Sequence, residues 1–220
     1  MMSRTENNNK LRIRSAEELT RQMEGLVVLS KVLDATLDRW FLSGGTLLGA
    51  YRDSDFIPWD WDVEVTVLTE EAQGREGALL RGLLTAGFSI ASSDSSWENF
   101  KIVAAGWGTE YEILGRYLKE NEGLRARRMT EVPARFFEMH ETVTFRGHDF
   151  PAPSPTDDFL EALYGGWKTP LKTADKQSYL SRRGLPLWGD RALCQTHRTA
   201  RPVAEATAGE RVSTGSGGGH

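Results

Sequence analysis

The chain has a single cysteine, no long apolar run and no excess of positive charge. Cys194 is the one thiol among 220 residues, which excludes a disulfide within the chain and a cysteine-rich zinc site. A formal net charge of −4 gives no general attraction for nucleic acid. No apolar stretch reaches the roughly 18 residues that a membrane span needs. We therefore expect no nucleic-acid partner and no membrane span.

Residues 1–10 are polar and lack the apolar core of a signal peptide. Together with the scarcity of cysteine, this predicts a protein of the reducing cytoplasm. If the substrate is an envelope glycan, we expect it to be met at the cytoplasmic side of the membrane.

The composition, with 39% hydrophobic and 26% charged residues, is that of one globular domain. We expect this domain to cover residues 13–195. A disordered segment is expected over 1–12 and a disordered tail over 196–220. The last eight residues of that tail, rich in glycine and serine, have the composition of a linker or tag remnant.

Apolar periodicity predicts a long helix near the amino terminus. Ser15 and Glu18 have the spacing of a capping box at its start. Apolar residues then recur at intervals of three and four, which gives the helix one buried face: Leu19, Met23, Leu26, Leu29, Leu33 and Leu37. Further helices are expected from Thr69 to about Gly87, and over 155–164 with Gly165 ending the latter.

Short apolar runs between these helices predict strands. They cover 40–42, 88–91, 100–104, 111–114 and 141–145, besides an acidic strand described next. No internal repeat is present. The order of elements predicts an α+β (mixed α/β) fold, with a mixed sheet flanked by helices.

Three acids alternate with apolar residues at Asp60, Asp62 and Glu64. Successive side chains of a strand point to opposite faces, so the carboxylates share one face and Trp61 is expected in the core. Crowded carboxylates raise each other's pKa unless a cation neutralises them, and oxygen ligands suit Mg²⁺ or Mn²⁺. The pattern predicts a metal site; a solvated strand face is the alternative.

A glycine-rich turn precedes the acids. Gly44 and Gly45 interrupt the strand 40–42, and residues 46–51 are expected to begin a short helix. Glycine lets a ligand come close to the backbone, and free amides at a helix start attract phosphate. The turn therefore predicts a phosphate site made of Gly44, Gly45 and the Thr46 hydroxyl. An ordinary strand-to-helix turn is the alternative.

The stretch GGTLLGAYR at 44–52, followed by FIPWDWDVEV at 56–65, resembles the signature of the LicD and fukutin-related family of phosphotransferases. The resemblance extends from about residue 15 to about 170, and 158–165 is similar to a short helix ending in Tyr-Gly in that family. It implies a nucleotidyltransferase fold. It also implies a metal-dependent enzyme that moves a phospho-alcohol, such as phosphocholine, phosphoribitol or phosphoglycerol, from a CDP-activated donor to a hydroxyl of a sugar or glycan.

The chain departs from the family pattern at its acids. Glu64 stands where the family usually has Asp, and Glu112 stands for the Asp of a later hydrophobic-Asp-hydrophobic strand. The resemblance implies that four residues bind Mg²⁺ or Mn²⁺ and act in catalysis: Asp60, Asp62, Glu64 and Glu112. Glutamate moves the ligand by on the order of 1 Å, and such a displacement can lower the rate about a hundredfold. For Glu110 and Glu112 the alternative is a strand with one solvated face.

Basic residues are candidates for the donor phosphates. Arg52 lies in the signature, and its guanidinium offers several donors to phosphate oxygens. Lys101, on an expected strand, and a cluster of arginines could also face an anionic substrate. We interpret all four residues mainly as solvated charge: Lys101, Arg125, Arg127 and Arg128.

With the CDP-activated donor that the resemblance implies, we expect an in-line attack of an acceptor hydroxyl on phosphorus, with cytidine monophosphate as the leaving group. Glu112 would bind a second metal or take the hydroxyl proton. Two other functions fit the sequence: a nucleotidyltransferase that releases pyrophosphate, and a glycan- or nucleotide-binding relative that has lost activity. The transferred alcohol, the acceptor and the oligomeric state are left open.

Overall fold

The computed structural model describes residues 12–119, 122–128 and 130–172. All of them belong to the first of two compact units, Met1–Leu187. The tail expected over 196–220, the end of the expected domain at 195, and Cys194 lie outside the described residues, as does nearly all of the expected segment 1–12.

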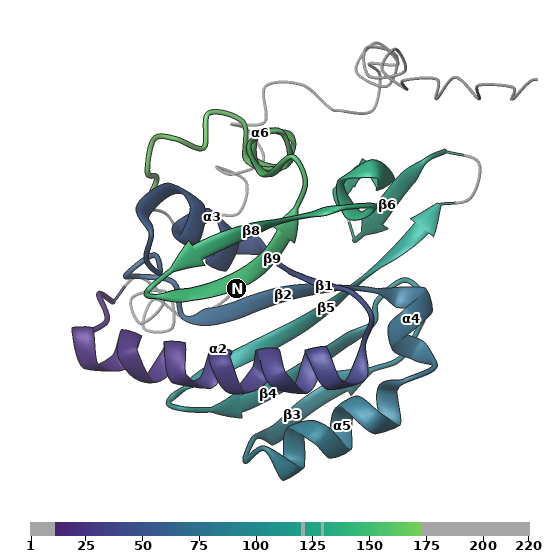
Figure 1. The fold of residues 1–220 in the computed structure, drawn as a ribbon, viewed down its shortest axis with the longest axis horizontal. Coiled ribbons are helices and arrows are strands. Elements are labelled where there is room, and N and C mark those ends of the chain that lie inside the picture. Colours follow the sequence, from purple (N-terminus) through teal and green to yellow (C-terminus); the bar gives the residue numbers. More distant parts are fainter. Residues whose placement is uncertain (1–11, 120–121, 129, 173–220) are drawn as a thin grey trace, which may run out of the picture. The chain divides into compact units, whose positions relative to one another are not determined.

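Helices and strands follow one another along the described chain as labelled in Figure 1. They are α2 (Ala16–Thr36), β1 (Trp40–Leu42), α3 (Gly44–Asp53), β2 (Asp62–Leu68), α4 (Thr69–Gln73), α5 (Glu76–Thr85), β3 (Ser89–Asp94), β4 (Lys101–Gly106), β5 (Thr109–Lys119), β6 (Leu124–Arg127), β7 (Thr130–Pro133), the 3₁₀ turn η1 (Ala134–Phe137), β8 (His140–Phe145), β9 (His148–Pro153) and α6 (Thr156–Tyr164).

Within the described ranges seven strands form one mixed sheet. Its main order is β1-β2-β5-β4-β3, and β6 and β7 extend it from the far end of β5. The pairing of β2 with β5 is parallel, and the other pairings are antiparallel. The strands β8 and β9 form a separate hairpin. The expected fold class, a mixed sheet flanked by helices, is confirmed.

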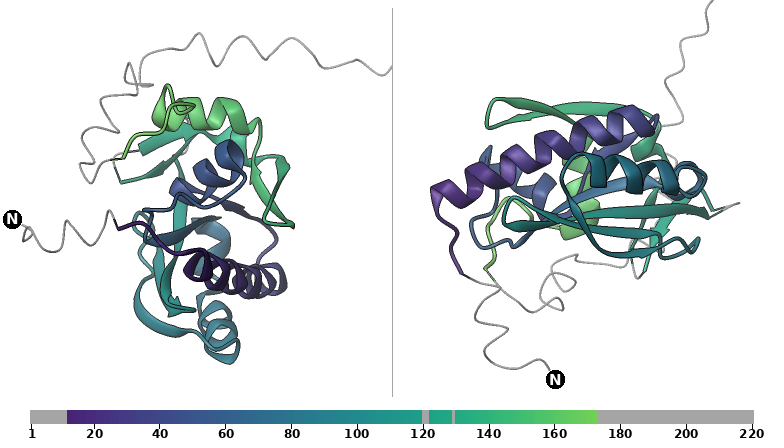
Figure 2. Two further views of the ribbon diagram at one scale, coloured as in Figure 1. Left: turned by 90° about the vertical axis from the view of Figure 1, so that its left-hand side faces the viewer. Right: turned by 90° about the horizontal axis from the view of Figure 1, so that it is seen from below.

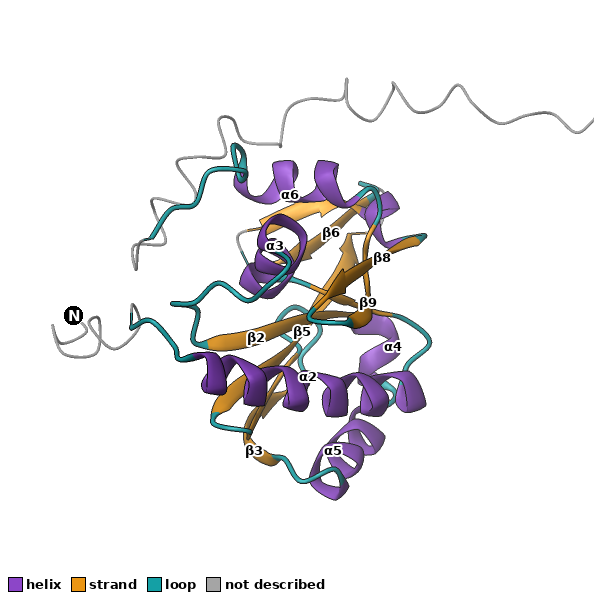
Figure 3. Cartoon of the chain, turned by 60° about the vertical axis from the view of Figure 1, so that its left-hand side comes forward, coloured by secondary structure: helices purple, strands orange, loops and turns teal. Residues whose placement is uncertain are grey.

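The two faces of the sheet have different neighbours. Tyr111 on β5 points toward α2 and donates a hydrogen bond to the Gln22 carbonyl at 3.0 Å. The adjacent Glu112 points to the opposite face, on which α3 lies. Figure 3 shows α3 and α2 on opposite sides of β2, and the views in Figure 2 show α2 and α5 side by side.

The core lies between the sheet and these helices, and several predictions about it are confirmed. The Ser15 side chain accepts from the Glu18 amide at 3.2 Å, while Glu18 accepts from the Ser15 amide at 2.7 Å, so the capping box is present. The apolar face of α2 is buried as expected.

In the described part of the chain, no helix has the length and apolar character needed to cross a membrane.

The helix expected from 69 to about 87 is wrong as a single element. It is divided into α4 and α5 at Gly74, a poor helix former. Arg75 follows with φ −119°, and its guanidinium donates to the Asp38 carboxylate at 2.8 Å and to the Thr36 carbonyl at 2.9 Å. These contacts tie the break to the loop that follows α2.

Three strands lacked a recognisable sequence pattern. Strand β6 contains two arginines among four residues, and β7 is only four residues long. Strand β9 contains Pro151 and Pro153, which remove ladder donors and are typical of edge strands. All three pair with a strand that is adjacent in the sequence, β5 with β6, β6 with β7 and β8 with β9, so the hairpins form without the apolar alternation by which strands were identified.

The close approach of α2 to β5 makes a testable prediction about Gly25. A Cβ at this position would lie 1.9 Å from the Tyr111 hydroxyl oxygen. Gly25→Ala should lower the free energy of unfolding by about 1–3 kcal/mol, although alanine is the better helix former. Gly77→Ala, at a helical glycine with ordinary contact distances, should raise it by up to about 1 kcal/mol. Urea unfolding measures both, and equal stabilisation by the two variants would contradict this packing.

Candidate active site

The acidic residues belong to two local structures. Strand β2 begins at Asp62, whereas Asp60 lies in a turn before the strand. The Asp60 amide donates to the Ile57 carbonyl at 2.9 Å, which closes this turn around Pro58. The expectation of one strand carrying all three acids is therefore wrong for Asp60, because proline favours a turn here.

Trp61 is not in the core, as had been predicted. It is half-buried and lines a surface pocket. Its carbonyl accepts hydrogen bonds from Arg14 and, at 2.6 Å, from the Thr109 hydroxyl, and Arg14 also donates to the Asp60 carbonyl at 2.7 Å. Arg14 thus holds the backbone of the turn in place. No sequence pattern identified this role.

The parallel register sets the remaining acids side by side. Asp62 on β2 is opposite Glu110 on β5, and Glu64 is opposite Glu112. In-register neighbours of a parallel pair point to the same face. We call the face with these four residues the acid face, and we call Asp60 and Asp62 the acid pair.

The amino terminus of α3 lies directly against the acids. A Cβ on Gly44 would be 1.6 Å from the Glu64 Oε2 atom, and one on Gly45 would be 1.8 Å from the Asp60 Oδ2 atom. Gly44 also has φ +55°, which favours glycine. The two glycines are therefore required by the closeness of the carboxylates to the backbone.

Glu64 accepts a hydrogen bond from the amino-terminal end of this helix. The Gly45 amide donates to Glu64 Oε2 at 2.8 Å, and the Glu64 amide donates to the Thr46 hydroxyl at 2.9 Å. The positive end of the helix dipole stabilises such a carboxylate. The residues expected to bind phosphate hence contact Glu64 in the described structure.

Burial and crowding disturb the titration of the acid pair. Asp62 is 9% exposed. Its burial, and the nearby charges of Glu64, Asp60 and Glu112, raise the pKa of Asp62 to about 9. Burial and the charge of Glu64 raise the pKa of Asp60 to about 7. At neutral pH the acid pair therefore retains a proton.

Glu112 and Lys101 form an ion pair. The Lys101 Nζ atom is 2.7 Å from Glu112 Oε1, and both side chains are largely buried. Lys101, expected to bind the donor, thus lies on the acid face beside a carboxylate expected to bind metal.

A divalent cation fits the acid pair. In the stretches that the structure describes, no three Asp, Glu, His or Cys side chains converge as ion ligands. Mg²⁺, however, is commonly held by one or two carboxylates together with water and substrate phosphates. A cation would also relieve the repulsion that raises the pKa of Asp62. Asp60 and Asp62 have the required chemistry, whereas Glu64 and Glu112 as ligands stay predictions.

Arg52 lies apart from the acids. It is seven residues beyond Gly45 on α3, a rise of about 10 Å. Its guanidinium pairs with Asp53 at 2.6 Å and donates to the Trp167 carbonyl at 3.4 Å. The structure does not bring Arg52 to the acid pair.

Two arginines of the cluster on β6 are buried, contrary to the interpretation as solvated charge. Arg125 pairs with Glu70 on α4 at 2.5 Å. Arg127 is 8% exposed, and Arg128 is exposed. The strand β6 buries the alternate arginines against β5 and α4, a consequence of pairing that the sequence pattern did not reveal.

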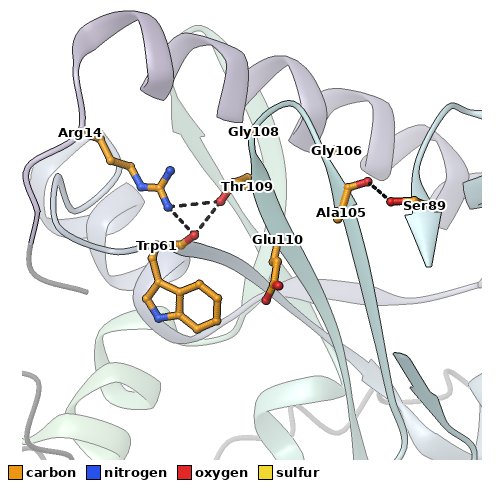
Figure 4. Close-up of a pocket in the computed structure, with 8 residues that line it drawn as sticks. All are labelled: Arg14, Trp61, Ser89, Ala105, Gly106, Gly108, Thr109 and Glu110. Atoms are coloured by element: carbon orange, nitrogen blue, oxygen red, sulfur yellow. Dashed lines mark hydrogen bonds between the residues drawn. The ribbon is translucent and has the colours of Figure 1, made fainter. Parts of the chain in front are cut away.

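A pocket of about 510 Å³ opens beside the acid pair, where β2 and β5 begin. Figure 4 shows the Trp61 ring and the Glu110 carboxylate projecting to the same side of it. Arg14, Ser89 and Thr109 line it as well. Within the described chain the Glu110 side chain has no hydrogen bond or ion pair. Because Glu110 is opposite Asp62, the pocket is continuous with the acid face.

The geometry can be compared with known proteins. Residues 38–155 match the family model described as LicD/FKTN/FKRP, nucleotidyltransferase domain. The matched region is more than half of the chain. It contains the glycine turn, the acid pair and both strands of the acid face.

Two curated relatives are 29% identical to the chain over 165 residues: the human and mouse proteins named ribitol 5-phosphate transferase FKRP. Each match covers 70% of this chain and 32% of the relative, so the chain spans about a third of their length.

Among solved structures, the solution structure of the antibiotic-resistance factor ANT(2'')-Ia has 17% identity and a TM-score of 0.49, covering 75% of this chain and 82% of that one. Its crystal structure with adenylyl-2''-tobramycin has 16% identity and a TM-score of 0.47, covering 74% and 86%.

The raised pKa values of the acid pair predict a pH-dependent stability. Both values lie above the roughly 3.9 of an unfolded aspartate, so the folded state binds more protons between about pH 4 and pH 9. The free energy of unfolding should therefore fall as the pH rises through this window. Asp62→Asn should flatten the fall and be more stable than the natural chain at pH 9. Urea unfolding in chelator-treated buffer measures both slopes, and equal slopes would contradict the assignment.

Proposed function

The chain belongs to the LicD/FKTN/FKRP nucleotidyltransferase family, and on this premise we propose that it is a metal-dependent transferase that moves a phospho-alcohol from a CDP-activated donor to a sugar or glycan hydroxyl. One observation carries the proposal: the Asp60 carboxylate lies directly against the amino terminus of α3, beside the buried Asp62 and within the matched residues. The names of the relatives support phosphoribitol as the transferred group.

The chain's own residues would hold the donor at this point. Asp60 and Asp62 present oxygens for Mg²⁺ or Mn²⁺, and the amides of Gly44 and Gly45 with the Thr46 hydroxyl face the same space. A cation bound there would neutralise the charge that develops on the leaving phosphate. A donor phosphate that took the Gly45 amide would replace the Glu64 carboxylate, which would then be free to turn toward the cation.

The acceptor would enter through the pocket beside the acid pair. The part-exposed Trp61 ring offers an apolar platform, and the Glu110 carboxylate can accept a hydrogen bond from a sugar hydroxyl. Glu110 is also better placed than Glu112 to take the proton, because Glu112 is paired with Lys101.

The transfer balances with these groups. The acceptor oxygen bonds to the phosphorus that carries the alcohol, and its proton passes to Glu110. The bond from that phosphorus to the bridging oxygen breaks, and its electron pair leaves with cytidine monophosphate. The acid face thus separates proton transfer, on β5, from charge neutralisation, at the acid pair.

Asp62→Asn tests the core of the proposal. With purified CDP-ribitol, a sugar acceptor and Mg²⁺, we expect the variant to lose activity by about a hundredfold or more, since the acid pair loses a charged ligand. Glu98→Gln removes an exposed acid and should retain full activity. Chromatography of the products measures the released cytidine monophosphate. Full activity of Asp62→Asn would overturn the proposal.

The same assay separates the two other functions. Release of pyrophosphate from a nucleoside triphosphate would identify a nucleotidyltransferase. Nucleotide binding that is indifferent to Mg²⁺, without turnover of CDP-ribitol, CDP-choline or CDP-glycerol, would identify a binding relative.

Glu110→Gln tests the proton acceptor. We expect kcat to fall by about 10²–10⁴ because the amide cannot take the proton, while the KM for the donor stays constant. If kcat is that of the natural chain, Glu110 has no part in proton transfer.

A further inference from the structure

Arg127 is a buried cation that forms no ion pair with a carboxylate of the described residues. Its residue is 8% exposed. The Nη1 atom donates to the carbonyl oxygens of Phe100 at 3.1 Å and Gly115 at 3.2 Å. Neutral carbonyls orient the guanidinium, yet they do not balance its charge. Burying a charge without a partner of opposite charge is unfavourable, so the position of Arg127 needs a physical explanation.

The two carbonyls place this guanidinium at the edge of the acid face. Phe100 immediately precedes Lys101 on β4, and Gly115 follows Glu112 by three residues on β5. The Gly115 amide donates to the Phe100 carbonyl at 2.8 Å, so the two are adjacent across the sheet. Arg127 therefore lies next to the ion pair of Lys101 and Glu112.

The electrostatic surroundings agree with this position. Burial lowers the pKa of Arg127, with a smaller lowering by Arg128, while the charges of Glu112, Glu64 and Asp94 raise it. Two of these three acids belong to the acid face. Neither of these two acids pairs directly with Arg127, because Glu112 pairs with Lys101 and Glu64 accepts from the Gly45 amide.

Part of the guanidinium keeps contact with solvent although the residue is buried. In the part of the chain that the structure describes, Nε and Nη2 of Arg127 make no hydrogen bond. They are also absent from the buried polar atoms that lack partners, so they retain contact with solvent. Two donors of this cation thus have no partner among the described residues and keep some contact with solvent.

We propose that Arg127 binds a phosphate oxygen of a diphosphate-containing substrate at the acid face. This inference rests on the proposed function, in which a donor diphosphate lies on that face. A guanidinium with two free donors matches two phosphate oxygens, and a phosphate supplies the charge that the two carbonyls lack. The diphosphate would be held between the acid pair with its cation on one side and Arg127 on the other.

Titration calorimetry with inorganic pyrophosphate in excess MgCl₂ tests the inference without requiring turnover. Arg127→Lys keeps the charge and loses the paired donors, so its Kd for pyrophosphate should rise about tenfold or more. Arg128→Asn is the matched control. It removes an exposed charge one residue away, and asparagine tolerates the φ of +50° found there, so its Kd should change less than twofold.

A purely structural role for Arg127 gives a different result. Arg127→Lys would then melt at a lower temperature while its Kd stayed within twofold of the natural chain, which would overturn the inference. No binding of pyrophosphate by the natural chain would also overturn it.

If Arg127→Lys fails to fold, NMR of the natural chain decides. Pyrophosphate should shift the Nε–H resonance of Arg127 and leave that of Arg128 in place, and no shift at Arg127 would overturn the inference. A chain that binds pyrophosphate through Arg127 but releases no cytidine monophosphate from any CDP-alcohol would contradict the proposed function and leave this inference standing.

Discussion

The amino terminus of α3 touches carboxylates with no side chain in between, and the site depends on this contact. Gly44 and Gly45 bring the backbone so close to Glu64 and Asp60 that even a methyl group would overlap them. The approach buries acids that would otherwise be solvated, and it supplies an amide to only one of them, Glu64. The acid pair is left crowded and short of positive charge, which is the electrostatic state that a cation relieves.

The parallel pairing of β2 and β5 distributes the remaining charge. It sets Glu110 beside Asp62 and Glu112 beside Glu64, so one face of the sheet carries acids from two strands. Lys101 neutralises one end of this row, whereas the Glu110 side chain has no partner among the described residues at the other end, next to the pocket. The net charge of the acid face therefore changes along its length. Its neutralised end lies by Arg127 and its negative end lies by the pocket.

The sequence was sufficient where the pattern is local. The capping box at Ser15, the glycine turn and the alternation through β2 are local, and the elements built on them are found. What depends on partners distant in the sequence was missed. The turn at Pro58 carries Asp60 out of the strand, and Arg14 binds the Trp61 carbonyl from a distant part of the sequence. The pocket beside Glu110 arises from the register of β2 with β5, and Arg127 is buried against the carbonyls of Phe100 and Gly115, which lie 27 and 12 residues before it.

The contact between the glycine turn and the acids also restricts how the chain can vary. A side chain at Gly45 would have to displace the Asp60 carboxylate, and one at Gly44 would have to displace that of Glu64. Any residue other than glycine at these two positions would therefore rearrange the charges around the acid pair, and the volume of a single methyl group would be enough to do so.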